Sequence, residues 1–143
     1  MAITTAMCNS FKQELLGGVH DLDTDTLKVA LIKASPSGTF DASTTNYSDL
    51  GADEATGTNY TAGGQALDSP VISLSGGTAF VDFADEVFTN LTISADGAII
   101  YNASQSNAAV AVFDFGATVT STSGDFTIVF PTADASNAVI RIS

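Results

Sequence analysis

The residues with the most reactive side chains stand near the start of the chain and have no evident chemical partners. His20 is the only histidine and Cys8 is the only cysteine among 143 residues. Nucleophilic catalysis needs a thiol or hydroxyl beside a base that a third group orients. No such set can be assembled from this sequence. We therefore interpret His20 as an ordinary surface or capping histidine, and Cys8 as a small buried apolar residue.

Three aspartates have the spacing with which a calcium-binding loop begins, namely Asp21, Asp23 and Asp25. The remainder of such a loop is missing. Its sixth position is Thr26, where glycine is needed for a sharp turn, and its twelfth is Ile32, where a bidentate glutamate is needed. The pattern favours a solvated turn, with an incidental ion as the alternative. We predict no metal site and no cofactor.

A second acidic cluster, Asp82, Asp85 and Glu86, has the residue types that hydrolyse glycosidic bonds. That chemistry also needs an aromatic platform for the sugar, and the chain has no tryptophan and only three tyrosines. A charged turn between Phe83 and Phe88 explains the cluster without catalysis. The common nucleotide, zinc-protease and hydrolase motifs are also missing. We predict a protein that is not an enzyme, and a small glycosidase using Asp82 and Glu86 is the enzymatic alternative.

Charge is distributed very unevenly along the chain. Residues 34–140 include no lysine, arginine or histidine, yet they hold 12 of the 16 acidic residues, and the formal net charge is −12. Nucleic acids and anionic membranes are bound by lysine and arginine, so both are excluded as partners. No apolar run reaches the roughly 20 residues of a membrane-spanning helix. No signal peptide is recognisable, so we expect synthesis and folding in the cytoplasm.

The N-terminal third of the chain combines one helix, one strand and one long loop. Ser10 and Gln13 have the spacing of a capping box, and glycines follow Leu16, so a helix is predicted over Ser10–Leu16. Alternating apolar residues predict a strand over Thr26–Ala34. Residues 39–64 are rich in Thr, Asn, Gly and Asp. They predict a long loop with one helical turn near Tyr47–Leu50, and loops of this length are commonly functional.

From Gln65 onward the sequence predicts a series of short strands separated by turn residues. Pro70 makes part of the first of them an edge strand or a bulge. The spacing is typical of a sandwich or barrel in a single domain, residues 1–143, with an arm and helix over residues 1–18. The predicted strands are Gln65–Leu74, Thr78–Phe83, Val87–Ile93, Gly97–Asn102, Ala109–Phe115, Phe126–Phe130 and Val139–Ile142.

Several segments resemble a family of small structural proteins of tailed bacteriophages: MCNSFKQELLGGVHDL, TLKVALIKA, GTAFVDFADEVFTNLTISADGAIIYN and GDFTIVFPTADASNAVIRIS. The similarity covers most of the chain and is weakest over residues 39–64. The family is that of capsid cement, or decoration, proteins. The resemblance implies a virion protein on the outer surface of a capsid built from an HK97-fold major capsid protein. It also implies self-association as a dimer or trimer, and no catalytic residues.

Taken together, these features predict an all-β, jelly-roll-like β-sandwich of about eight strands with one short N-terminal helix. The expected function is to stabilise the capsid by bridging major capsid subunits. The near-neutral chain ends are expected to make partner contacts, and the acidic residues to lie on exposed loops and outward strand faces. Predicted interface residues come from the arm, the helix and the long loop: Met1, Ile3, Met7, Phe11, Leu15, Tyr47 and Tyr60.

The alternative is a tail or fibre component that binds a receptor or a glycan, since jelly rolls also serve as lectins. A glycan site needs exposed aromatic rings, and Tyr47 and Tyr60 are the only aromatic candidates in the predicted loop.

Overall fold

The five-stranded sheet at the centre of the protein is organised by two long antiparallel strands, β8 (Glu86–Asn102) and β9 (Ala108–Ile128). A computed structural model describes residues 2–131, 133–134 and 136–143. Strand β3 (Leu27–Lys33) pairs with the second half of β8, and β5 (Gln65–Ala66) and β2 (Ala6–Met7) occupy the edges. The strand order is β2-β9-β8-β3-β5.

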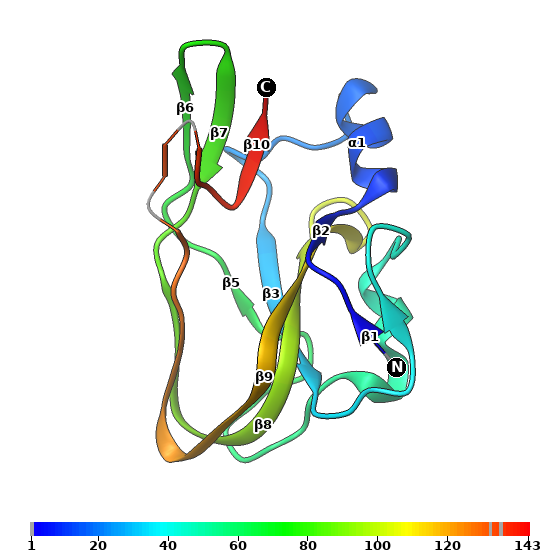
Figure 1. Ribbon diagram of the computed structural model, residues 1–143, viewed down its shortest axis with the longest axis vertical. Coiled ribbons are helices and arrows are strands. Elements are labelled where there is room, and N and C mark those ends of the chain that lie inside the picture. Colours follow the sequence, from blue (N-terminus) through cyan, green and yellow to red (C-terminus); the bar gives the residue numbers. More distant parts are fainter. Residues whose placement is uncertain (1, 132, 135) are drawn as a thin grey trace.

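The β8–β9 pair bends sharply: from the lower edge in Figure 1, one half runs up the left side of the molecule and the other runs up through its centre beside β3. The register shifts between Ala95 and Gly97, and a side chain on Gly97 would meet the carbonyl oxygen of Phe113 at 2.4 Å. In β9, Ser123 has a φ of 48°, a left-handed conformation common at bulges. The prediction of four separate strands here is therefore wrong. Asp96 and Gly97 form a bulge and not a turn, so the strand continues through them.

A second, three-stranded sheet lies at the upper end of the molecule in Figure 1. Its order is β10-β7-β6, with β6 (Val71–Ser75), β7 (Thr78–Asp82) and β10 (Ile140–Ile142) all antiparallel. Strand β6 lies at an edge, as the proline at position 70 predicted. The C-terminal strand thus joins a hairpin that is about 60 residues earlier in the sequence.

The N-terminal arm is held in place by pairing. Strand β1 (Ala2–Ile3) lies parallel to β4 (Thr39–Phe40), and β2 lies antiparallel to β9. Helix α1 (Asn9–Leu16) begins one residue earlier than predicted. Its N-cap is Cys8, and no side chain caps it, so the predicted capping box at Ser10 is wrong.

The long loop covers part of the five-stranded sheet. It contains the 3₁₀ segment η1 (Tyr47–Asp53), which the predicted helical turn anticipated, and Asn46 caps it through a capping box with Asp49. Isolated bridges join the loop to the strands at Ile32–Glu54 and Thr58–Thr92. The loop backbone approaches so closely that a side chain on Gly64 would overlap the carbonyl oxygen of Val29.

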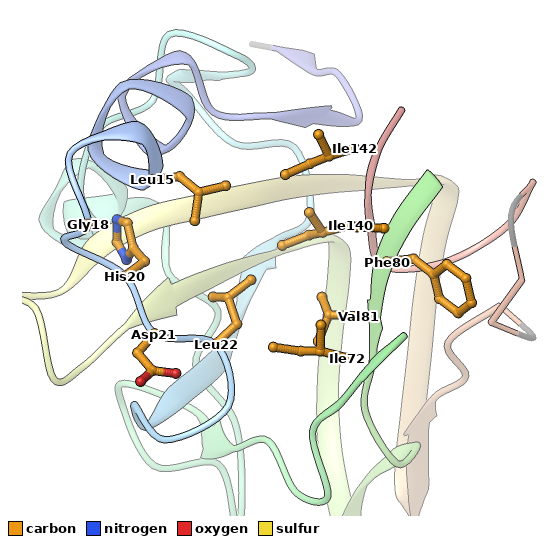
Figure 2. A pocket seen from close by; sticks show the side chains of 11 residues that line it. Leu15, Gly18, His20, Asp21, Leu22, Ile72, Phe80, Val81, Ile140 and Ile142 are labelled. Atoms are coloured by element: carbon orange, nitrogen blue, oxygen red, sulfur yellow. The ribbon is translucent and has the colours of Figure 1, made fainter. Parts of the chain in front are cut away.

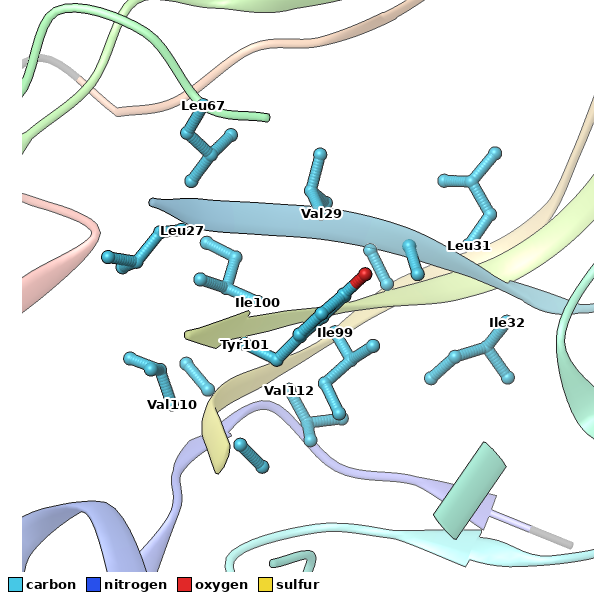
Figure 3. Close-up of a cluster of buried hydrophobic side chains, with 14 of the residues drawn as sticks. Leu27, Val29, Leu31, Ile32, Leu67, Ile99, Ile100, Tyr101, Val110 and Val112 are labelled. Carbon is cyan, nitrogen blue, oxygen red and sulfur yellow. The ribbon is translucent and has the colours of Figure 1, made fainter. Parts of the chain in front are cut away.

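The core lies between the sheet, the helix and this loop, and Figure 3 shows its centre. The all-β class is confirmed, with ten strands in the described residues where about eight were predicted. A jelly roll is not established, because β8 and β9 form a simple hairpin within one sheet. No helix among the described residues is long and apolar enough to span a membrane. The fully buried residues with the largest side chains include Phe11, Phe88, Leu27, Leu31, Ile32, Leu91, Ile99 and Ile100.

Candidate docking surface

An open apolar groove of about 400 Å³ lies between the end of helix α1 and the three-stranded sheet (Figure 2). Leu15, Gly18 and Leu22 form one wall, and residues of all three strands form the other. The groove therefore brings together both ends of the chain, one from the helix and one from strand β10. Figure 2 shows Leu15 and Ile142 facing each other across its mouth.

The strand register explains why the sheet wall is apolar. Residues paired across an antiparallel sheet point to the same face. Ile72 pairs with Val81 and Leu74 with Ala79, while Ile140 and Ile142 of β10 pair with the same two residues of β7. One face of this sheet consequently carries only apolar side chains. We call it the apolar face, defined by the six residues Ile72, Leu74, Ala79, Val81, Ile140 and Ile142.

Only the inner half of the apolar face is covered. Val81 and Ile140 are buried, but Ile72 is 54% exposed, Leu74 is 73% exposed and Ile142 is 50% exposed. Leu16, at the end of α1, is 93% exposed. Contiguous exposed apolar surface of this kind marks interaction sites in soluble proteins. The groove and its rim therefore form the strongest docking candidate among the described residues.

A polar cluster stands at one corner of the groove and is centred on His20. The side-chain amide of Asn102 donates to Nδ1 of His20 at 3.0 Å, so Nε2 carries the hydrogen and donates to Glu14 Oε1 at 3.3 Å. The ring also packs against Phe11, with 4.9 Å between ring centroids. Of the two alternatives predicted for His20, a surface or a capping residue, the surface location is wrong: His20 is buried, and its hydrogen bonds fix the chain that leaves the helix.

Two of the three aspartates, Asp21 and Asp25, stabilise the turn through their carboxylates. Asp21 Oδ1 accepts hydrogen bonds from the backbone amides of Asp23 and Thr24. Asp25 Oδ2 accepts from Asn102 at 2.7 Å, and this bond is the main reason that the pKa of Asp25 is lowered. No group of three or more His, Cys, Asp or Glu side chains among the described residues could hold a metal ion. The carboxylates of Asp21 and Asp25 are instead engaged with backbone and amide groups.

The second acidic cluster lies away from the groove. Glu86 is buried, and burial, followed by repulsion from Asp68, raises the pKa of its carboxyl group. Asp85 Oδ1 accepts a hydrogen bond from the backbone of Phe130. Neither Glu86 nor Asp82 lines the groove or either of the other two cavities described. The geometry gives no support to a pair of glycosidase carboxylates.

The tyrosines of the long loop are tied to Glu54. Both Tyr47 and Tyr60 donate their hydroxyl hydrogens to its carboxylate, and the Gly63 amide donates to it at 2.6 Å. Tyr47 also stacks on Tyr101 with 4.6 Å between ring centroids. Burial, with the nearby Glu54 charge, raises the pKa of both Tyr47 and Tyr60. These rings join the loop to the core, so they are not free platforms for a sugar.

The structure separates the predicted interface residues into distinct groups. Phe11 is fully buried, so the prediction that it lies on an interface is wrong. It is the residue of α1 that packs into the hydrophobic core. Ile3 and Met7 are half-buried and pack against the core. Leu15 alone of the predicted set lines the groove. Met1 lies outside the described residues.

The predicted exposure of the acidic residues is confirmed for only half of those in the base-free run. Asp53 and Glu86 are buried. Asp53 forms an ion pair with Lys33 at 2.8 Å and accepts from the amides of Ser37 and Gly38. The exposed members are Asp49, Asp68, Asp85, Asp114, Asp125 and Asp134.

Sequence reasoning missed most of the groove. Ile72, Leu74 and Ile142 lie in segments that were predicted as strands, but their common face depends on a pairing between distant hairpins. The alternation in Val71–Ser75 beside Pro70 was the available signal for an apolar edge strand. Comparisons of the chain with protein-family models, with curated proteins and with solved structures find no match.

Proposed function

We propose that this protein is a structural cement protein of a tailed-phage virion. It binds the outer surface of the capsid through the apolar groove and bridges neighbouring subunits of an HK97-fold major capsid protein. The observation that carries the proposal is the exposed apolar face beside the end of α1. The capsid as the partner is suggested by the resemblance of the sequence segments described above.

The energetics of the groove suit a bridging role. Covering an aliphatic side chain contributes about 1.5–3 kcal/mol when it passes fully from water to a packed contact. Three side chains on one sheet face, each at least half exposed, therefore supply a modest contact in each copy. Many copies on one shell act together, so modest contacts can resist a distributed outward load.

The position of the groove agrees with the expected role of the chain ends. Helix α1 and strand β10 both lie outside the base-free run or at its boundary, and both line the groove. A partner that approaches here meets an apolar wall before it meets the acidic loops. Asp21 is the one charged residue among those that line the groove, so little of the net charge of −12 opposes a partner there.

We do not propose the glycan-binding alternative. It depended on free aromatic rings at Tyr47 and Tyr60, and Glu54 engages both hydroxyls. Hydrophobic contact through the groove is also compatible with attachment elsewhere on a virion, so the assay must use heads themselves.

The test is decoration of purified heads that carry the major capsid protein but lack this protein. Ile142→Asp places a carboxylate on the apolar face, and burying it unpaired costs several kcal/mol, so we expect at least a tenfold loss of affinity. Val129→Asp is the matched control, because Val129 is 70% exposed and lies outside the groove. Bound copies are counted on quantitative gels.

Equal decoration by both variants and the unmodified protein would contradict the role of the groove. Deleting residues 1–7 also tests the predicted role of the arm, and unchanged occupancy would contradict that role. Lower occupancy after this deletion could also follow from a disturbed fold, because β1 and β2 pair with other strands. The point variant at Ile142 avoids this ambiguity.

A further inference from the structure

We infer that strand β6 pairs with β6 of a second copy of this chain, antiparallel and about a two-fold axis at Ser73. This inference does not depend on which assembly the groove binds. It concerns the outer edge of the three-stranded sheet, where β6 has β7 on one side and no further strand on the other among the described residues. A free, regular, apolar edge strand is a template for pairing with another chain.

The edge of β6 is more regular than the free edge of β9. All five residues of β6 pair with β7 without a register shift. Strand β9 instead has a positive φ at Gly116 and at Ser123, and its register with β8 shifts several times. Bulges of this kind are a common protection of an edge strand against pairing. Strand β6 has no such protection.

Charge favours a second copy at this edge. Two copies with a net charge of −12 repel each other, so they must meet where no carboxylate faces another. Residues 69–81, which include β6, its turn and nearly all of β7, contain no charged residue. The nearest acidic residues in the sequence are Asp68 and Asp82, at the two ends of this stretch.

The sequence of β6 is self-complementary in one register. A two-fold axis perpendicular to a sheet leaves each side chain on its own face, so a residue can pair only with one that shares its face. Centring the axis on Ser73 satisfies this condition and uses all five residues, Val71–Ser75. Ile72 then lies opposite Leu74 of the second copy, and the apolar face continues across six strands.

Pairing of two five-residue edges buries a small area compared with the roughly 800 Å² per partner of a standard interface. We therefore expect a weak dimer that forms only at high protein concentration. Added salt screens the repulsion between the acidic copies, so the dimer strengthens as ionic strength rises.

The test is sedimentation equilibrium of the full chain at low and high salt. Ser73→Asp places two carboxylates opposite each other at the axis, and we expect it to weaken the dimer at least tenfold. Thr122→Asp adds the same charge at an exposed position of β9 and is the matched control. Mixing Ser73→Asp with Ser73→Lys should restore a dimer containing one of each, which a folding defect would not do.

Several results would overturn the inference. They are a monomer at all concentrations up to about 1 mM, a trimer, or a dimer unaffected by Ser73→Asp. A monomer whose Ser73→Asp variant loses only head decoration would assign the edge to the partner and not to a second copy. Failure of the proposed function is distinguishable, because Ile142 lies on β10, at the opposite edge of the sheet. Ile142→Asp should lower decoration and leave the dimer intact.

Discussion

Ile99 in the five-stranded sheet is fully buried, on the face that it shares with Tyr101, whereas Ile72 and Ile142 in the three-stranded sheet are about half exposed. The difference arises from what lies over each sheet. The long loop, residues 39–64, packs onto β3 and is fastened there by Glu54, Asp53 and the tyrosines. Over the apolar face of the three-stranded sheet, the end of α1 and the turn after it provide a partial cover.

The comparison shows how the same residue types can serve two purposes. Isoleucine beneath the loop contributes to folding, because its contacts are complete within the chain. Isoleucine on the outer half of the apolar face contributes little until another surface covers it. The length of the loop, which suggested a functional segment, is explained by its role as the cover of the core.

The largest expected effect comes from removing the same side chain in each sheet. Ile99→Ala should lower the free energy of unfolding by about 3–4 kcal/mol, because it leaves a cavity in a packed core. Ile72→Ala should lower it by less than about 1 kcal/mol, because its side chain is half solvated. Urea denaturation of both variants measures the difference, and similar losses would remove the distinction between the sheets.

A smaller effect is expected from loosening the loop. Glu54→Ala removes the acceptor of two tyrosine hydroxyls and of the Gly63 amide. Leaving such donors unpaired should cost about 2–3 kcal/mol, and the loop amides should exchange faster with solvent. Asp23→Ala, at an exposed turn position, is the control and should change little. If Glu54→Ala leaves hydrogen exchange of the loop unchanged, the carboxylate does not hold the cover.

The smallest effect is a pH dependence at Asp53. The hydrogen bond from Lys33, followed by that from the Ser37 amide, lowers the pKa of Asp53 from 3.8 to about 2. A lowered carboxyl pKa stabilises the fold above the unfolded value, and the contribution is lost as pH falls from about 4 towards 2. We expect a loss of about 1 kcal/mol across that range. Asp53→Asn should flatten it, and a slope that persists in this variant must come from other carboxyls.

The sequence predicted local structure better than it predicted contacts. Helix α1, strand β3 and the edge position of β6 follow from capping glycines, alternation and Pro70, all of which act over a few residues. The continuity of β8 through Asp96 was missed, because a bulge and a turn use the same residues. Turn composition alone does not separate the two.

The candidate site was harder to predict, because it is made by distant segments. Leu15 was predicted from its place in the helix, but Ile142 becomes a neighbour only when β10 joins β7. Tyr47 and Tyr60 were predicted as interface residues because they are aromatic residues in a polar loop. Their hydroxyls instead bind the Glu54 carboxylate, which accounts for their place in the loop. The exposure of Asp53 was mispredicted for the same reason. Asp53 is buried and pairs with Lys33, a base that precedes the base-free run in the sequence.

The central claim is that the groove beside α1 is the surface that binds the capsid. Hydroxyl-radical footprinting of the free protein and of the protein on heads measures this directly at side-chain resolution. We expect oxidation of Leu15, Ile72 and Ile142 to fall on binding, and oxidation of Val129 to be unchanged. Protection confined to the long loop or to β9, with the groove residues still oxidised as in the free protein, would contradict it.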